Sequence, residues 1–129
     1  MRVCRQFHFD AAHRLPNYEG QCANLHGHRW VLEVEVKGKV DSGTGFVLDF
    51  SVLRTIVEKE VLQELDHRYL NDTCYNPTCE NILVWVGQRL SGKLKQDNYH
   101  LSRLRLYETP DSYAEEIFGE SFSEVNGGH

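Results

Sequence analysis

Residues 26–40 read HGHRWVLEVEVKGKV, and this stretch contains the clearest strand in the sequence. From Trp30 onward, apolar and polar side chains mostly alternate, which predicts a strand over residues 28–40 with one buried and one exposed face. At the start of the stretch, His26 and His28 are two residues apart. In an extended backbone, residues at this spacing point to the same side. The strand that decides the fold therefore begins with a pair of imidazoles on one face.

Further elements are expected on both sides of that strand. Alternation over residues 3–13 predicts a partner strand, joined to it by a polar loop at 14–25. Apolar residues at helical spacing predict two helices, the first capped by Asp49 and running to about residue 65, the second capped by Thr78. The remaining strands are expected at 100–108 and 112–118.

The expected order β-β-α-α-β-β favours antiparallel pairing and an α+β domain with both helices on one face of the sheet. Four strands in such a sheet leave edges unpaired, so we expect a homo-oligomer that closes them. Residues 1–118 are expected to form a single catalytic domain. The tail at 119–129 is expected to be frayed.

Composition excludes several classes of protein. The chain has 129 residues and a net charge of −5, which argues against nucleic acid or anionic membranes as partners. Mean hydropathy is −0.51, and no apolar run approaches the ~18–20 residues of a membrane span. The first ten residues lack the apolar segment of a secretory signal, so we expect a cytoplasmic protein. The four cysteines include no CxxC pair, and in a reducing compartment disulfides are disfavoured.

Three histidines predict a metal site. If the strands at 3–13 and 28–40 pair as a hairpin, His13 comes close to His26 and His28. Three neutral imidazoles leave the fourth position of a zinc ion open, which is the arrangement of catalytic rather than structural zinc. The alternative is that HGH forms a turn and that His13 is an ordinary residue at the end of a strand.

Four further residues are candidates for chemistry. Cys22 precedes the histidine pair in the loop, where a nearby cation would lower the pKa of its thiol; it is alternatively a fourth ligand or an inert residue. Asp66 and His67 form an acid–base pair or simply the polar end of a helix. Glu108 is expected to point inward at a strand end, where it pairs with a ligand offering two parallel N–H donors or with an arginine.

Six motifs occur in a fixed order: FDAAHRLP (9–16), CANLHGH (22–28), GFVLDF (45–50), LDHRYLND (65–72), NPTCEN (76–81) and YET (107–109). Together they resemble the 6-pyruvoyltetrahydropterin synthase family over about residues 5–118. The short spacing between Cys22 and HGH, together with LDHRYLND and NPTCEN, is similar to the bacterial 6-carboxytetrahydropterin synthase branch of that family.

The resemblance implies the tunnelling fold, in which three β-β-α-α-β-β units form a barrel and two trimers stack as a hexamer. It implies 7,8-dihydroneopterin triphosphate as substrate. The implied products are 6-carboxy-5,6,7,8-tetrahydropterin, acetaldehyde and triphosphate, on the route to queuosine and other 7-deazapurines. The runner-up is a 6-pyruvoyltetrahydropterin synthase, which eliminates triphosphate and keeps the side chain. A third possibility is a zinc-stabilised oligomeric binding module without catalysis, in which Cys22 completes the site.

The resemblance also assigns a role to individual residues. Zn²⁺ is the implied cofactor. The implied roles are zinc ligation for His13, His26 and His28, proton transfer for Cys22 and for His67 supported by Asp66, anchoring of the pterin for Glu108, and pterin contact for Thr78.

Overall fold

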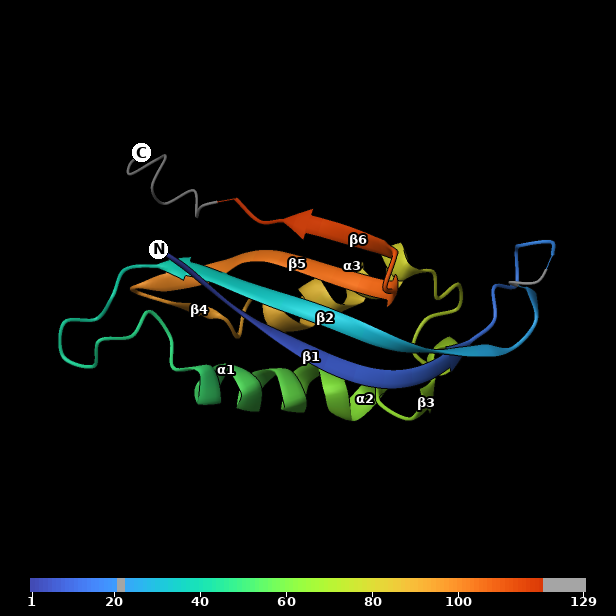
Figure 1. The fold of residues 1–129 in the computed structure, drawn as a ribbon, viewed down its shortest axis with the longest axis horizontal. Coiled ribbons are helices and arrows are strands. Elements are labelled where there is room, and N and C mark those ends of the chain that lie inside the picture. The colour runs from blue at the N-terminus through green and yellow to red at the C-terminus, as the bar shows by residue number, and fades with distance from the viewer. Residues whose placement is uncertain (21–22, 120–129) are drawn as a thin grey trace.

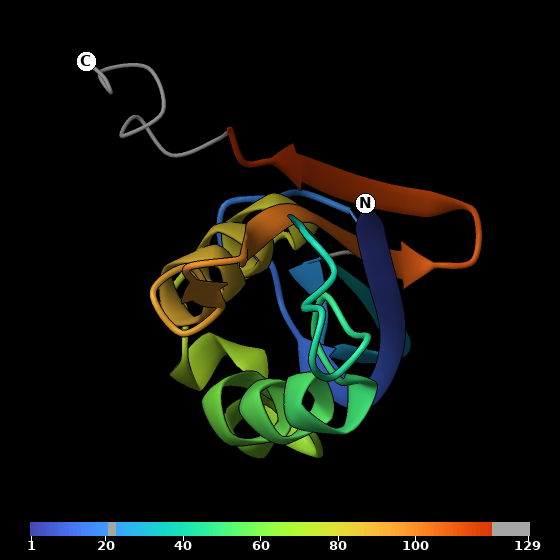
Figure 2. The same cartoon turned by 90° about the vertical axis from the view of Figure 1, so that its left-hand side faces the viewer.

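The computed structural model describes residues 1–20 and 23–119, and its strands form one curved sheet with helices on one side (Figures 1 and 2). The sheet order is β3-β1-β2-β5-β4, and β6 also pairs with β5. The elements are β1 (Arg2–His13), β2 (His26–Gly38), α1 (Phe50–Val57), a π-helical segment (Glu58–Leu62), α2 (Gln63–Leu65), β3 (Arg68–Tyr69), a 3₁₀ turn (Leu70–Asp72), α3 (Cys79–Leu90), β4 (Lys95–Gln96), β5 (Tyr99–Thr109) and β6 (Ser112–Ile117).

The expected α+β architecture is confirmed, because the four long strands pair antiparallel and the helices cover one face. β1 and β2 pair along their whole length, from Arg2 opposite Lys37 to His13 opposite His26. Residues directly opposite one another share a face, and the rings of Phe9 and Trp30 stack there with centroids 5.8 Å apart. This register places the apolar side chains of both strands in one core.

The helices begin where their capping residues predict. The Asp49 carboxylate accepts a hydrogen bond from the Ser51 amide, and the Thr78 hydroxyl accepts one from the Asn81 amide. The helical segments from Phe50 to Leu65 bury an apolar stripe at a spacing of four residues. This stripe comprises Leu53, Val57, Val61 and Leu65, all 0% exposed.

The polar segment at residues 66–77, between the long helices, contains short elements that its sequence does not predict. Arg68 and Tyr69 pair in parallel with Ala11 and Ala12 of β1, which forms the short strand β3. Leu70 follows and is fully buried. One apolar side chain in a polar stretch has no periodicity to reveal it, so its burial depends on tertiary packing. The second two-residue strand, β4, pairs with the start of β5 and was also not expected.

No helix in the described part of the chain is long and apolar enough to span a bilayer. Of the tail expected to be frayed, residues 120–129 lie outside the described residues.

The pairing of β1, β2 and β5 makes Leu32 a sensitive test of the core, since it lies opposite both Phe7 and Leu106 and is 0% exposed. We predict that Leu32→Ala lowers the free energy of unfolding by about 2–5 kcal/mol, because it removes buried methyl groups and leaves a cavity. Chemical denaturation at fixed protein concentration measures the change. The control is Val52→Ala, on the exposed face of α1, which should stay within about 0.5 kcal/mol of wild type. Equal effects of the two substitutions would contradict this core.

Candidate metal centre

The register of β1 and β2 brings three histidines to one end of the sheet. His13 lies directly opposite His26, and His28 lies two residues further along β2, opposite Ala11. All three occupy the face that carries the buried residues Phe9 and Trp30, so their rings turn toward the helices. The ring centroids of His13 and His26 are 4.5 Å apart, and those of His26 and His28 are 4.9 Å apart.

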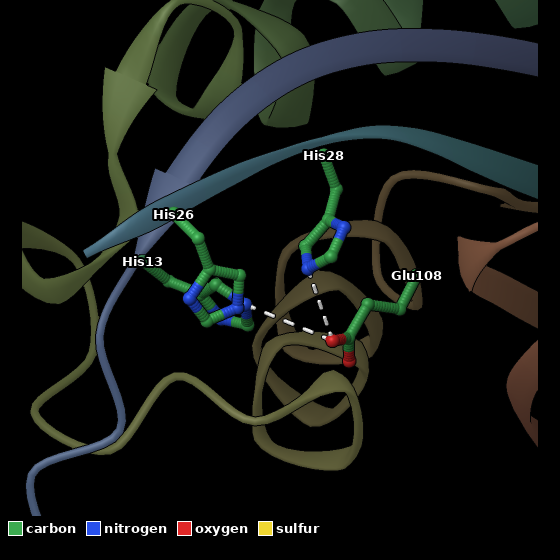
Figure 3. Close-up of side chains that lie close together, drawn as sticks. All are labelled: His13, His26, His28 and Glu108. Atoms are coloured by element: carbon green, nitrogen blue, oxygen red, sulfur yellow. Dashed lines mark ion pairs between the residues drawn. The ribbon is translucent and has the colours of Figure 1, made fainter. Parts of the chain in front are cut away.

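Glu108 reaches the same point from β5 (Figure 3). The pairing of β5 with β6 is irregular between Tyr107 and Thr109, immediately around this residue. The Glu108 Oε2 atom lies 3.2 Å from His28 Nε2 and 3.7 Å from His13 Nε2. The ligand atoms of His13, His26, His28 and Glu108 all lie within 4.8 Å of one another. We call these four residues the histidine–glutamate group.

Backbone carbonyls fix the tautomers of two imidazoles. His13 Nδ1 lies 2.8 Å from the Pro77 carbonyl oxygen, and His26 Nδ1 lies 2.7 Å from that of Asn24. A carbonyl oxygen only accepts hydrogen bonds, so each Nδ1 carries the proton and donates it. Each Nε2 is then left with a free lone pair. Outer-shell bonds of this kind are typical of histidines that bind metal ions.

Two imidazole nitrogens of the group are buried without a hydrogen-bond partner, and this points to a missing ligand. His13 is 0% exposed, and the Nε2 atoms of His13 and His28 are buried without any hydrogen-bond partner. An unsatisfied buried polar atom costs about 1–3 kcal/mol, so it calls for an explanation. Burial also lowers the pKa of His28, partly offset by Glu108, which favours the neutral form that binds metal ions. The residues present therefore fit a divalent metal ion.

The Asp66–His67 pair forms, but it lies outside the histidine–glutamate group. His67 Nδ1 is 3.1 Å from Asp66 Oδ2, and the side chains are 79% and 41% exposed. The pair is held to β1, because the Asp10 amide donates to Asp66 Oδ1 and the His67 amide donates to the Asp10 carbonyl oxygen. His67 adopts a positive φ of 59°. One surface depression is nevertheless lined by both His67 and His28.

Thr78 and Cys79 lie beside the group at the start of α3. The Thr78 hydroxyl caps this helix, and the preceding residue, Pro77, bonds His13. Cys79 is buried, and its thiol donates to the Leu106 carbonyl oxygen at 3.1 Å. Burial raises the pKa of Cys79 to about 11, so the thiol stays protonated and attaches α3 to the strand that carries Glu108. Its spacing in the sequence does not indicate this contact, because it depends on how α3 packs.

Cys22, expected to carry proton transfer, lies outside the described residues. Among the described cysteines, Cys4, Cys74 and Cys79 are all free. Cys4 is exposed on the face of the sheet away from the helices, 3.8 Å from Arg103.

The chain is similar to known proteins in both sequence and fold. Residues 2–117 match the family model described as 6-pyruvoyl tetrahydropterin synthase. The 6-carboxy-5,6,7,8-tetrahydropterin synthase of Haemophilus influenzae is 31% identical, over 88% of this chain and 96% of its own length. The dihydroneopterin monophosphate aldolase of Pyrococcus furiosus is 42% identical, over 83% of this chain and 89% of its own length.

The fold is similar to that of solved structures. The 6-pyruvoyl tetrahydropterin synthase of Caenorhabditis elegans superimposes with a TM-score of 0.81 at 26% identity, covering 92% of this chain and 96% of that one. The enzyme of the same name from Plasmodium falciparum gives a TM-score of 0.63 at 20% identity, covering 92% and 98% of the two chains, and shows the shared fold alone.

The geometry of the histidine–glutamate group predicts about one bound divalent metal ion per chain. We predict that His26→Ala and His28→Ala each weaken metal binding by at least about 100-fold, since losing only an outer-shell partner costs ~10–100-fold. Metal analysis of protein purified without chelators, followed by competition titration, measures the loss. The control is His8→Ala, because His8 is exposed on the opposite face of β1. Unchanged metal content in both site variants would contradict the assignment.

Proposed function

The chain belongs to the 6-pyruvoyl tetrahydropterin synthase family, and from that premise we propose that it is a zinc-dependent carbon–carbon lyase. The proposed reaction converts 7,8-dihydroneopterin triphosphate to 6-carboxy-5,6,7,8-tetrahydropterin, acetaldehyde and triphosphate. The observation that carries the proposal is the histidine–glutamate group at the sheet end of a chain in this family. Relatives named 6-carboxy-5,6,7,8-tetrahydropterin synthase, from Haemophilus influenzae and Synechocystis, support this choice within the family.

The metal and the pterin are assigned to separate residues. His13, His26 and His28 hold the zinc ion, which when bound acidifies hydroxyl groups and polarises carbonyl groups of the substrate side chain. Glu108 accepts two parallel N–H bonds from the pterin ring, and this orients the side chain toward the metal. Thr78 follows Pro77, whose carbonyl oxygen contacts His13, and is proposed to contact the ring.

Moving protons between carbon atoms needs a base and an acid around the substrate. We assign one role to the thiol of Cys22, which precedes His26 by four residues. The other falls to His67, whose Nδ1 is paired with Asp66 so that Nε2 is free to exchange a proton. Since His67 and His28 line one depression, a substrate held at the metal would extend toward this pair.

The proposed assembly is a homo-oligomer, most simply a hexamer of two trimers. β3 covers only Ala11 and Ala12 on the outer edge of β1 within the described chain, so most of that edge is available to a neighbouring subunit. We further propose that the product serves the synthesis of queuosine and other 7-deazapurines.

A second candidate function is cleavage of dihydroneopterin monophosphate. The observation that favours it is the 42% identity to the Pyrococcus furiosus aldolase. This reaction also breaks a carbon–carbon bond in a pterin side chain, so it would require similar positioning of metal, base and acid.

Product analysis tests the proposal directly. The zinc-loaded protein should release acetaldehyde and the carboxylated pterin in equal amounts from 7,8-dihydroneopterin triphosphate. A coupled assay measures the aldehyde, and chromatography measures the pterin. Triphosphate release without acetaldehyde would indicate a 6-pyruvoyl synthase. Cleavage of the monophosphate alone would indicate the aldolase. No turnover of either substrate would favour a binding module.

A variant separates proton transfer from metal binding in this assay. Cys22→Ala should lose about 10²–10⁴-fold in turnover while keeping its zinc content, because general acid–base catalysis contributes about that factor. Cys4→Ala, a change at an exposed thiol outside the site, is the matched control. If zinc content falls together with activity, Cys22 is a ligand rather than a base.

A further inference from the structure

The end of the sheet opposite the metal centre carries basic side chains on four neighbouring strands. Arg2 of β1 lies directly opposite Lys37 of β2. Lys37 lies opposite His100 of β5, which in turn lies opposite Lys95 of β4. We call these four residues the basic row. Residues directly opposite one another share a face, and like charges in such positions, as in Arg2 and Lys37, destabilise a sheet.

Two surface depressions of about 360 Å³ each meet at the middle of the basic row, because Lys37 and His100 line both of them. Arg2 and Arg103 also line one depression, and Lys39 lines the other. In a chain with a net charge of −5, positive side chains are thus gathered around one hollow. Arginine and lysine side chains only donate hydrogen bonds, so a ligand here has to supply acceptors.

The imidazole of His100 is a second, independent indication of a ligand. Its Nε2 atom is buried and has no hydrogen-bond partner among the described residues. A buried polar atom without a partner is rare in folded proteins and calls for an explanation. An anion at the basic row would accept a hydrogen bond from Nε2 and would also offset the repulsion between Arg2 and Lys37.

Two carboxylates lie beside the basic row, Glu35 in one depression and Asp97 in the other. Glu35 is engaged elsewhere, because it accepts hydrogen bonds from the Ser102 hydroxyl at 2.8 Å and from Arg103 Nε at 3.2 Å. Its contact with Arg2 Nε is longer, at 3.4 Å. Asp97 is exposed, where the attraction between opposite charges is weak. These carboxylates therefore do not replace an anionic ligand.

We propose that the basic row binds a chain of linked phosphates, at a site distinct from the metal centre. Neighbouring strands lie about 4.8 Å apart, so the row spans about 14 Å, and an extended polyanion contacts more of it than a single phosphate does. His13 lies eleven positions after Arg2 in β1, about 36 Å along the strand at ~3.3 Å per residue. Figure 1 shows β4 and the N-terminus at one end of the sheet and β3 toward the other. One small ligand therefore cannot occupy both sites, and the inference is independent of the proposed function.

Calorimetric titration of the zinc-loaded protein with inorganic triphosphate tests the site. Lys37→Gln removes a charge from the middle of the row, and His100→Phe keeps a ring but removes both nitrogens. Each should weaken triphosphate binding by about 10-fold or more, because a hydrogen bond to a charged group contributes about that factor. Far-ultraviolet circular dichroism checks that both variants fold. Arg2→Gln, at an exposed position, replaces a variant that does not fold.

Two control variants locate the binding. Lys59→Gln removes an exposed charge from the helical side, and Arg29→Gln removes one that lines the depression beside His28. Both should retain the affinity of the basic row for triphosphate. Loss of binding in Arg29→Gln, with full binding in the row variants, would place the phosphates near the metal centre and overturn the proposal. Absence of triphosphate binding to wild type would overturn it as well.

Two further probes define the ligand. Inorganic phosphate should bind more weakly than triphosphate, and equal affinities would contradict recognition of a phosphate chain. ATP separates the two sources of such a chain. Tighter binding of ATP than of triphosphate indicates a nucleotide, and equal or weaker binding indicates a free chain. In both cases the proposal requires that binding weakens in Lys37→Gln and His100→Phe.

Discussion

The antiparallel register of β1 and β2 is the constraint on which the site depends. It sets His13 opposite His26 and Phe9 opposite Trp30, so the pairs that build the core and the pair that builds the metal centre belong to one ladder. A shift of one residue would turn the imidazoles of one strand to the opposite face. The apolar contacts beneath the site therefore also position its ligands, and β5 adds Glu108 through its pairing with β2.

Most of the fold follows from local patterns in the sequence. Alternation in β1, β2 and β5 and the caps Asp49 and Thr78 act within a few residues, and these elements appear where they are expected. β3 and the buried Leu70 do not follow from such patterns, because they depend on tertiary packing and on an unpaired edge of β1 that accepts a partner. The irregular pairing around Glu108 likewise arises between two strands and has no signature in either.

The grouping of the three histidines could be predicted from the sequence because it depends only on the pairing of β1 with β2. Two imidazoles at i and i+2 and a third at the end of the partner strand come together once β1 and β2 form a hairpin. Glu108 was expected to point inward as a pterin anchor, and the structure sets its carboxylate against His28 as well. The carbonyl contacts of Pro77 and Asn24 could not be predicted. Every residue carries the same backbone carbonyl, so the sequence does not indicate which one will contact a histidine. Proximity in sequence also did not indicate that Asp66 and His67 form a separate, exposed pair held by Asp10.

We propose that the register of β1 and β2 builds a metal centre from three imidazoles. X-ray absorption at the zinc edge of the pterin-free protein tests this claim most directly, because zinc–sulfur bonds of about 2.3 Å are distinct from zinc–nitrogen and zinc–oxygen bonds of about 2.0–2.2 Å. We expect one shell of nitrogen and oxygen atoms with the outer scattering of three imidazoles. A sulfur atom in the first shell, contributed by Cys22, or fewer than three imidazoles would contradict it.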